Sequence, residues 1–484
     1  MNIGRSLIIK SLLWKYFERL GAQIISFVVS VLLARLLTPD HYGAIALIMI
    51  FINVCNVIID GGLNTALIQK KQADDLDFST ILYSSLLISA LLYCILFFAA
   101  PYIAEFYAVP ILSKVIRIIG INLIFYALNS VQRAYVSKHM MFNVLFYSSF
   151  IAVLLSGLIG ILLAYNGAGI WALVAQNMSC VIITSIVMWF TIKWRPSLMF
   201  SIDRFWGLFR YGWKILMANF ITVMFVEVRK LCIGKIYSTS NLAYYEKGEQ
   251  FPSLVMNNIF TSIQTILLPT FSEYQEDKAK IKSMMRRATK MSCFVIYPLM
   301  VGMIVTAGPL VHMLLGDKWS GAVPFIQIMC VANFFRPITI SNWEAIKALG
   351  YSDITLKLEV LKKIIDIIIL LITIKIGVTA VAWGVVLFNF ICIFINLFPN
   401  IKLLNYKIKE QILDAIPTFL ISILMGVVIY FLRGLDISNI WLFIIQVIMG
   451  IMTYIGFCRL FKEESMMFLL DLLKQSIQKK KSQL

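Results

Sequence analysis

The chain of 484 residues is 60% hydrophobic and only 14% charged, and its mean hydropathy is +0.86. A soluble globular protein carries about 25% charged residues. This composition therefore excludes a soluble globular fold and indicates a protein that lies largely within a membrane. The net charge of +18 raises the separate question of whether the chain binds nucleic acid.

Taken in chain order, the sequence is a nearly continuous series of apolar stretches, each long enough to cross a bilayer. A hydrocarbon core of about 30 Å requires about 20 apolar residues in a helix. The expected fold class is therefore an all-α integral membrane protein. We expect fourteen transmembrane helices, at residues 12–37, 41–60, 78–100, 112–137, 143–165, 168–190, 207–237, 249–271, 289–311, 323–348, 354–375, 378–400, 412–432 and 437–461.

The connections between these stretches are too short to form a soluble domain. The longest polar ones are Lys193–Trp206 and Ser272–Lys290. The phosphate-binding pattern Gly-x-x-x-x-Gly-Lys-Ser/Thr is absent, so we expect no ATP bound by a P-loop and no cofactor. We also expect no enzymatic activity, because a membrane-embedded glycan polymerase would need long extracytoplasmic loops.

The basic residues are concentrated on one side of the expected helices. If the N-terminus is cytoplasmic, both tails and the even-numbered loops carry most of the Lys and Arg residues, among them Lys70, Lys138, Lys282 and Arg286. The positive-inside rule then predicts that both termini are cytoplasmic. Topology and contact with anionic lipids account for the basic excess, so we expect no binding to nucleic acid.

Cysteine and histidine do not form recognisable sites in this sequence. The eight cysteines all fall within the expected helices, and no two of them have the Cys-x-x-Cys spacing. The three histidines, His41, His139 and His312, are far apart along the chain. We therefore expect neither a disulfide nor a metal site.

Two segments follow the same pattern, which indicates two related halves. In residues 34–45 and again in 234–245, a helix ends near a cation, makes a tight polar turn and re-enters through small and aromatic residues. Six expected helices separate the copies, so the halves would be parallel repeats around a central cavity. We expect an N-lobe at residues 1–200, a C-lobe at 201–405, two further helices at 406–461 and a basic, amphipathic cytoplasmic tail at 462–484.

Several expected helices carry polar residues at steps of three and four, which place these residues on one helix face. Ionisable groups at membrane depth usually line an aqueous path. Cations predominate among them, and because Arg and Lys bind phosphate, this favours an anionic ligand such as a lipid diphosphate. We expect the substrate to contact Arg19, Lys214, Arg229, Arg336, Asn129 and Asn257, with the four cations together forming the anion site for the diphosphate. We expect Asp60 or Glu227 to couple transport to an ion.

The same side chains also have a purely structural interpretation. Asn, Ser and Thr between membrane helices often only hydrogen-bond to neighbouring helices. The deep cations could pair with Glu18, Glu227 or Glu344 and hold helices together. Asp60 could be an ordinary carboxylate at a helix end, because Gly61 and Gly62 follow it directly.

Two further groups of charged residues are expected at the membrane surface. Lys357, Lys362 and Lys363 lie near the expected cytoplasmic face, and we expect their side chains to extend to the lipid headgroups. The run Asp74-Asp75-Leu76-Asp77 is similar to the metal-binding Asp-x-Asp of sugar-nucleotide enzymes. No soluble domain surrounds this run, so we expect a short solvated loop.

The residues Ala-Arg-Leu-Leu-Thr-Pro-Asp-His-Tyr-Gly at 34–43 resemble the polysaccharide flippases of the multidrug/oligosaccharidyl-lipid/polysaccharide exporter superfamily. Within this superfamily the chain is similar to the O-antigen and colanic-acid exporter branch. The resemblance continues in order at 60–70, 166–174, 268–272 and 314–319, and it covers roughly residues 10 to 360.

This resemblance implies a flippase for undecaprenyl-diphosphate-linked oligosaccharide repeat units, which cross a central cavity by alternating access while the lipid tail stays in the bilayer. It also implies a bacterial inner-membrane location, contact with membrane lipids, and a polysaccharide polymerase and chain-length regulator as partners. Lipid II flippases of the superfamily use arginines near helix 1, and Arg19 lies at a comparable depth. The alternative is a multidrug cation antiporter driven by H⁺ or Na⁺, which would need an acidic site such as Asp60.

Overall fold

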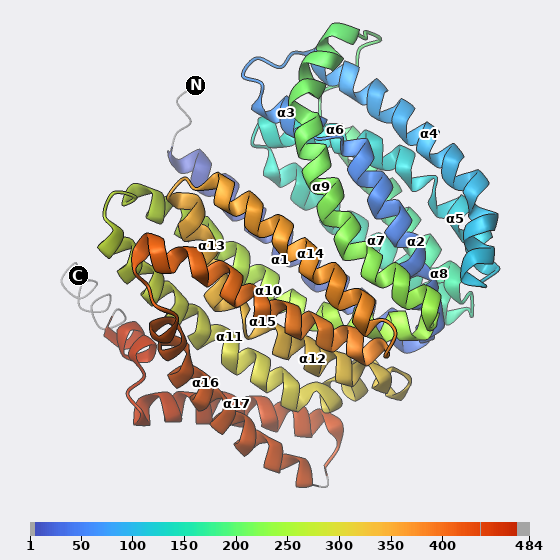
Figure 1. Ribbon diagram of the computed structural model, residues 1–484. Coiled ribbons are helices and arrows are strands. Elements are labelled where there is room, and N and C mark those ends of the chain that lie inside the picture. Colours follow the sequence, from blue (N-terminus) through green and yellow to red (C-terminus); the bar gives the residue numbers. More distant parts are fainter. Residues whose placement is uncertain (1–4, 436, 472–484) are drawn as a thin grey trace, which may run out of the picture. The chain divides into compact units, whose positions relative to one another are not determined.

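The computed structural model describes residues 5–435 and 437–471, with side chains described from Gly21 onward and that of Ser352 excepted. In these ranges every regular element is a helix, as expected (Figure 1). Within them, ten helices are long and apolar enough to cross a bilayer, or eleven if the bent pair Asp317–Asn333 and Arg336–Ala348 is one span. The predicted count of fourteen is therefore not confirmed. The expected spans at 207–237 and 354–375 do form helices, but charged side chains lower their hydropathy.

The contacts divide the chain into two compact units, Met1–Ala243 and Tyr244–Leu484. The first unit contains α1 (Arg5–Leu36), α2 (Pro39–Asp60), α3 (Leu63–Gln69), α4 (Asp75–Tyr107), α5 (Ile111–Ile119), α6 (Asn122–Lys138), α7 (Phe142–Tyr165), α8 (Ile170–Thr191) and α9 (Ile202–Ile236). Helix α10 (Thr239–Glu273) begins in the first unit and continues into the second. The second unit adds α11 (Lys278–Leu314), η1 (Asp317–Ala322), α12 (Val323–Asn333), α13 (Arg336–Ala348), α14 (Ser352–Thr373), α15 (Val378–Leu404), α16 (Ile408–Phe431), η2 (Leu432–Gly434) and α17 (Asn439–Leu460).

The boundary between the units differs from the expected lobe boundary at residue 200. Helix α9, which we assigned to the C-lobe, packs against α2, α3 and α4 within the first unit. Figure 1 shows α9 running alongside α2. The interpretation of the chain as two six-helix repeats with two additional helices stays a prediction. The final part of the expected tail, from residue 472, lies outside the described residues.

Three helices are much longer than a bilayer requires. Helices α9 and α10 have 35 residues each and α11 has 37. At a rise of about 1.5 Å per residue, each is over 50 Å long and extends beyond a hydrocarbon core of about 30 Å. The expected polar loop Ser272–Lys290 is therefore mostly helix. Its Asp277 caps α11 by accepting a hydrogen bond from the Lys280 amide at 2.9 Å, so only a short connection remains.

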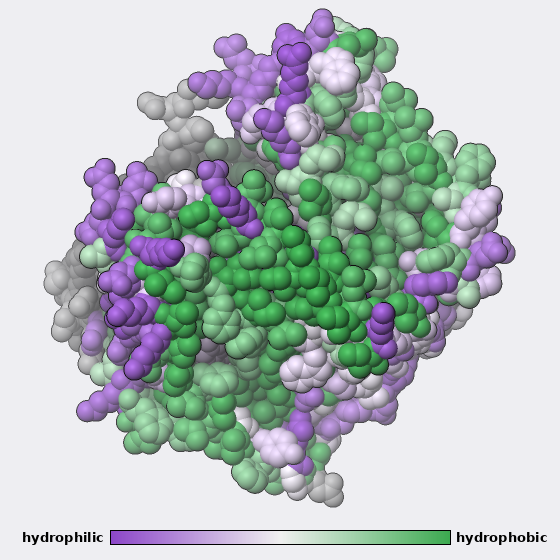
Figure 2. Space-filling model, viewed as in Figure 1, coloured by the Kyte–Doolittle hydropathy of each residue, from purple (hydrophilic) through white to green (hydrophobic). Residues whose placement is uncertain are grey.

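Apolar side chains are divided between unit cores and the surface that meets lipid. In the first unit, Phe78 of α4 packs edge-on against Tyr135 of α6, with ring centroids 5.3 Å apart, and also against Trp194. In the second unit, Leu356 and Leu371 on the outer face of α14 are 67% and 60% exposed. Figure 2 shows hydrophobic side chains covering broad surfaces, with hydrophilic ones gathered toward the margins. This is the pattern of helices that face hydrocarbon.

Glycines allow α9 to approach the end of α2 at backbone distance. Gly62 has a φ of +67° in the break between α2 and α3, and a Cβ there would lie 2.2 Å from the carbonyl oxygen of Gly212 on α9. A Cβ on Gly212 would in turn lie 3.0 Å from the carbonyl oxygen of Gly61. Side chains at this crossing would separate the two helices.

We expect Gly62→Ala to destabilise the protein by more than about 2 kcal/mol. The left-handed backbone alone disfavours an L-residue by roughly 1–2 kcal/mol, and the new methyl group also collides with the Gly212 carbonyl. The matched control is Gly207→Ala on α9, where a Cβ meets nothing within 4 Å. Thermal unfolding in detergent should show a lower midpoint for Gly62→Ala only. Equal midpoints for the two variants would contradict the close backbone contact.

Candidate functional site

A pocket of about 300 Å³ lies within the second unit among α10, α13, α14 and α15. Its wall combines four aromatic rings with three cations, one carboxylate and several amides. We call it the Arg336 pocket. Its lining is Phe260, Gln264, Phe335, Arg336, Thr339, Ile340, Trp343, Glu359, Lys362, Lys363, Phe388, Asn389, Cys392 and Asn396.

The break between α12 and α13 places Arg336 in this pocket. Pro337 has no amide hydrogen to donate to the previous turn, so the helix is interrupted at Phe334 and Phe335 and resumes at Arg336, with a bend of 41°. Interrupted helices at membrane depth are tolerated where they line a cavity. Arg336 and the positive N-terminal end of α13 therefore add to the same local potential, which favours an anion.

The two best-defined cations of the pocket are held against aromatic rings. The half-buried guanidinium of Arg336 lies 4.7 Å from the centroid of Phe260, and its Nη1 donates to Asn333 Oδ1 at 3.4 Å. Lys362 is 8% exposed, and its Nζ lies 4.0 Å from the ring of Trp343 and 3.1 Å from Glu359 Oε1. Lys362 does not extend to the headgroups as we predicted, because the ring and the carboxylate hold it inside.

Asn396 is a buried polar group whose side chain has no hydrogen-bond partner among the described residues. Its side chain is fully buried on α15 and lines the Arg336 pocket, yet neither its amide nitrogen nor its oxygen makes a hydrogen bond with the described residues. Leaving such a group unsatisfied costs about 1–3 kcal/mol. A buried amide of this kind can hydrogen-bond to water or to a polar ligand in the pocket.

The carboxylate of Glu344 lies beside the pocket and is fully compensated. Glu344 is 2% exposed and accepts hydrogen bonds from Gln264 Nε2 at 3.1 Å and from Lys347 Nζ at 3.0 Å. Among the residues that line the pocket, the three cations Arg336, Lys362 and Lys363 outnumber the one carboxylate, Glu359. Glu249 also interacts electrostatically with Arg336.

The first unit contains a second intramembrane polar group, around Asp60 at the end of α2. Its two oxygens accept hydrogen bonds from Asn64 Nδ2 at 2.7 Å and from the Tyr126 hydroxyl at 2.9 Å. Arg133 of α6 is exposed and close enough to interact electrostatically with both Asp60 and Tyr126. These four residues form the Asp60 cluster, which joins a carboxylate to a cation across α2, α3 and α6.

If Asp60 couples transport to an ion, as the sequence predicts, Asp60→Asn should lower export and flatten its dependence on pH, because an amide cannot exchange a proton. The matched control is Tyr126→Phe, which removes one hydrogen bond from Asp60 and keeps the titratable group. Export by both variants should be measured across a pH series at equal membrane levels. If Asp60→Asn kept the wild-type rate and pH profile, Asp60 would have no role in coupling.

Two of the predicted site residues make structural contacts between helices. Glu227 of α9 is 5% exposed, accepts a hydrogen bond from Asn53 Nδ2 of α2 at 3.1 Å and lies 3.7 Å from Lys230 Nζ. Asn129 of α6 is 3% exposed and donates to the Val181 carbonyl of α8 at 3.3 Å. Both arrangements agree with the structural interpretation, and a role in transport stays a prediction for each.

The remaining predicted residues lie on different helices. Lys214 is exposed and Arg229 half-buried on α9, Asn257 is exposed on α10, and the side chain of Arg19 lies outside the described residues. Fifteen positions separate Lys214 from Arg229 on one uninterrupted helix, a distance of about 22 Å. One phosphate cannot contact both. The shared diphosphate site of Arg19, Lys214, Arg229 and Arg336 stays a prediction, with these two cations contacting different parts of the substrate.

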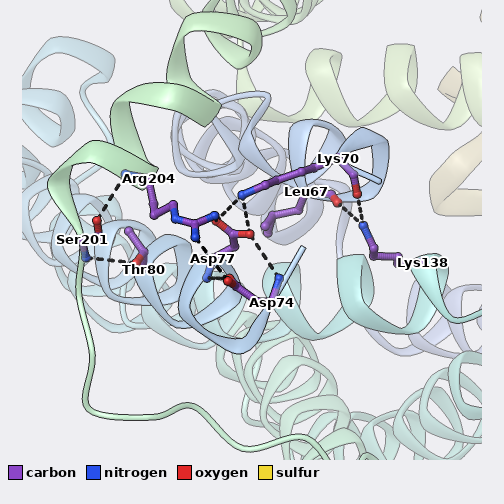
Figure 3. Close-up of polar contacts among 8 residues, drawn as sticks. All are labelled: Leu67, Lys70, Asp74, Asp77, Thr80, Lys138, Ser201 and Arg204. Carbon is purple, nitrogen blue, oxygen red and sulfur yellow. Dashed lines mark hydrogen bonds and ion pairs between the residues drawn. The ribbon is translucent and has the colours of Figure 1, made fainter. Parts of the chain in front are cut away.

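The run Asp74–Asp77 is not the solvated loop that we expected. Asp74 caps α4, and Asp77 is fully buried, with its carboxylate 2.6 Å from Lys70 Nζ and 3.5 Å from Arg204 Nη1 (Figure 3). Lys138 donates to the backbone carbonyl of Leu67 at 3.0 Å and also to that of Lys70. The Arg204–Asp77 contact joins the start of α9 to α4, and the Lys138 contacts join α6 to the end of α3.

Sequence reasoning missed Trp343 and Asn396, and it assigned Lys362 to the membrane surface. A partial signal was available for Asn396, because Asn389, Asn396 and Asn400 interrupt an otherwise apolar helix at steps of seven and four. No local signal identifies Trp343, since its contacts with Lys362 come from another helix.

An apolar chain whose described elements are all helices, ten of them long and apolar enough to cross a bilayer, is a multi-pass membrane protein. The sequence belongs to the polysaccharide biosynthesis protein family, whose family model matches residues 32–324. The succinoglycan biosynthesis transport protein ExoT of Rhizobium meliloti (strain 1021) is 23% identical over 323 residues, which make up 66% of this chain. The match spans 65% of the length of ExoT.

Solved structures share this fold. The lipid II flippase MurJ, in an inward closed conformation, is 18% identical with a TM-score of 0.73, covering 94% of this chain and 99% of MurJ. A multidrug resistance MATE family transporter of the MOP superfamily, in an inward-facing conformation, is 14% identical with a TM-score of 0.60, covering 79% of this chain and 94% of the transporter. These two structures show a shared fold, and the match to the polysaccharide biosynthesis protein family confirms the resemblance to polysaccharide exporters noted from residues 34–43.

Proposed function

We propose that this protein is a flippase that moves undecaprenyl-diphosphate-linked oligosaccharide repeat units from the cytoplasmic to the outer leaflet by alternating access, for synthesis of a surface polysaccharide. The Arg336 pocket carries this proposal. It places excess positive charge and aromatic rings inside a unit that otherwise presents apolar helices to lipid. Membership of the polysaccharide biosynthesis family and the transport name of ExoT support the same function.

The chemistry of the pocket fits one part of such a substrate. Arg336 offers a planar fork of donors for phosphate, and Lys363 adds a second positive charge. The rings of Trp343, Phe260 and Phe388 offer flat apolar faces, and Asn396 offers unused donors and an acceptor. A pocket of about 300 Å³ is at the small end of ligand sites. It therefore accommodates the diphosphate with one sugar rather than a whole repeat unit.

The fold alone does not separate this function from export of drug cations, because a MATE transporter shares it. A cation exporter needs an unneutralised carboxylate in its binding cavity. Asp60 instead accepts hydrogen bonds from Asn64 and Tyr126 and lies near Arg133. The cationic Arg336 pocket would repel a drug cation. Charge therefore favours the lipid-linked anion.

Reconstitution tests the proposal directly. We expect liposomes containing the purified protein to move a fluorescent polyprenyl-diphosphate-linked oligosaccharide between leaflets, so that a membrane-impermeant reductant bleaches more than half of the label. Protein-free liposomes should lose only the outer half. The same proteoliposomes, tested with a fluorescent drug cation, should show no uptake. Two results together would favour the antiporter. Bleaching would equal that of protein-free liposomes for several lipid-linked glycans, and the proteoliposomes would take up the drug cation.

We further propose that the protein lies in the bacterial inner membrane with both termini in the cytoplasm, on the basis of the basic residues in loops such as Lys70–Lys71 and around Lys282. A reporter fused after Leu484 should be active only in the cytoplasm, and one inserted at Val109–Pro110 only on the outer side. The insertion site lies in the short connection between α4 and α5. Reporters active on the same side would overturn this topology. A polymerase and a chain-length regulator remain proposed partners.

A further inference from the structure

A second cavity, of about 510 Å³, lies in the second unit at the beginning of α11, beside the segment that follows α17. Four cations of α11 line it, namely Lys282, Arg286, Arg287 and Lys290, against the single carboxylate of Glu464. Steps of four, one and three place these cations on one helix face. The Arg336 pocket shares none of these residues, so the two cavities are separate.

Carboxylates outside the cavity orient three of its cations, including Lys290, whose Nζ lies 3.3 Å from Asp414 Oδ1. Asp414 of α16, whose side chain is 3% exposed, binds Arg286 through two hydrogen bonds, from Nε and Nη2, both at 2.8 Å. The Tyr406 hydroxyl donates to the same carboxylate at 2.7 Å. Glu410 similarly holds Lys282 at 2.7 Å. Because Asp414 engages one edge of the guanidinium, Arg286 keeps its remaining N–H groups for a ligand in the cavity.

Arg287 supplies charge that no carboxylate of the described residues neutralises. The Arg287 guanidinium lies 3.7 Å from the ring centroid of Phe468, which belongs to the segment after α17. Arg287 is exposed. A guanidinium resting on a ring keeps its edge donors available. Ser283 provides a hydroxyl group in the same wall, whereas the Ser465 hydroxyl donates to Glu463 Oε1 at 3.1 Å. The cavity thus combines fixed cations with one hydroxyl donor, a donor set that suits phosphate.

The position of the cavity favours a lipid as the source of that phosphate. On α11, the exposed apolar side chains that face hydrocarbon begin at Val295, which is 40% exposed, and continue at Leu299, which is 44% exposed. Val295 lies five residues after Lys290, or about 7 Å along the helix. The cavity therefore lies at the depth of lipid headgroups, where basic pockets between membrane helices bind acidic lipids.

We propose that the cavity at the beginning of α11 binds the phosphate of an acidic phospholipid headgroup, with Arg286 and Arg287 as the principal donors. The segment after α17 forms one wall of the site, since Lys290 pairs with Glu464 and Arg287 packs on Phe468. A bound headgroup would bridge α11 to this segment and stabilise their contact. This inference does not depend on what the protein transports.

The test compares wild type with Arg287→Gln and a matched control, Lys280→Gln. Lys280 is an exposed cation of the same helix that lies over Tyr274 and outside the cavity, so the control has the same change in charge. Purified proteins are titrated in detergent with phosphatidylglycerol, with phosphatidylcholine, and with inorganic phosphate. The thermal midpoint is followed against ligand concentration, and the midpoints without ligand show whether each variant folds.

Phosphatidylglycerol should raise the midpoint of wild type and Lys280→Gln, and phosphatidylcholine should not. Arg287→Gln should need roughly tenfold more phosphatidylglycerol for the same shift, the loss expected for one charge-assisted hydrogen bond. If only inorganic phosphate raised the thermal midpoint, and Arg287→Gln weakened that effect, the cavity would still be a phosphate site but its ligand would be soluble. If Arg287→Gln and Lys280→Gln gave identical titrations, the proposal would be overturned, because the overall charge of the protein would then account for the attraction of the lipid.

Discussion

Replacing Arg336 with Ala is expected to reduce export of the lipid-linked glycan roughly ten- to hundredfold at a nearly normal membrane level. A charge-assisted hydrogen bond contributes on the order of 1.5–3 kcal/mol, which corresponds to that range in affinity. Among the described residues, Arg336 donates one long hydrogen bond to Asn333, packs on the ring of Phe260 and interacts electrostatically with Glu249. Removing it should therefore affect binding more than folding.

Three companion variants make this expectation specific to the Arg336 pocket. Arg336→Lys should recover only part of the export, because the bidentate fork is lost. Lys357→Ala removes one exposed cation of α14 outside the pocket and should export normally. Asn396→Leu replaces a buried, unpartnered amide with an apolar side chain of similar size. If the pocket holds substrate, this variant should be at least as stable as wild type but export less.

Export of the glycan should be measured in cells at protein levels matched by immunoblot. Normal export by Arg336→Ala and by Asn396→Leu would remove the pocket from the transport path. Loss of the Arg336→Ala protein from the membrane would instead favour a structural role. If Arg336→Lys restored the membrane level of the protein but not export, the binding role of Arg336 would be separated from its structural role.

The sequence predicted helix starts and stops well where local chemistry determines them. Gly61 and Gly62 end α2, as expected from the run at Asp60, and the tight turn between Leu36 and Pro39 is confirmed. The break before Pro337 follows from the missing amide hydrogen of proline. By contrast, the expected loop Ser272–Lys290 was wrong, because charged residues with good helix propensity extend α11 beyond the membrane.

Contacts between distant segments could not be predicted in this way. The pair of Lys362 with Glu359 follows from helical spacing, but burial of Lys362 depends on Trp343 from another helix. Lys362, which is near the expected membrane surface, was therefore assigned to the lipid headgroups, whereas it lies in the Arg336 pocket. Similarly, the spacing of Asp74 and Asp77 is that of a helix cap, whereas Arg204 reaches Asp77 from far along the chain. Periodicity identifies a polar face, and only the fold identifies its partners.

Asp77→Asn is expected to destabilise the protein by about 2–4 kcal/mol. Removing one partner of a buried ion pair typically costs about 3–5 kcal/mol. The estimate here is lower because the side chains of Lys70 and Arg204 are 29% and 41% exposed and can turn partly to water. Asp77 also accepts a hydrogen bond from the Asp74 amide at 3.1 Å. Its loss should therefore loosen both the start of α4 and the attachment of α9.

Asp74→Asn is the matched control, because Asn caps a helix about as well as Asp. The hydrogen bond from the Asp77 amide lowers the pKa of the Asp74 carboxyl, so Asp74 is ionised at neutral pH. Its stabilising effect is present above its usual pKa and is lost as the pH falls through the lowered value. At pH 7 the control removes an exposed charge and its exposed ion pair with Arg204 Nη2, which lies 3.4 Å away, so its thermal midpoint should stay within about two degrees of wild type. Asp77→Asn should lower the midpoint by several degrees and expose the beginning of α9, near Arg204, to limited proteolysis. If Asp77→Asn and Asp74→Asn had the same midpoint and the same protease resistance, the buried carboxylate would not be what holds α9 against α4.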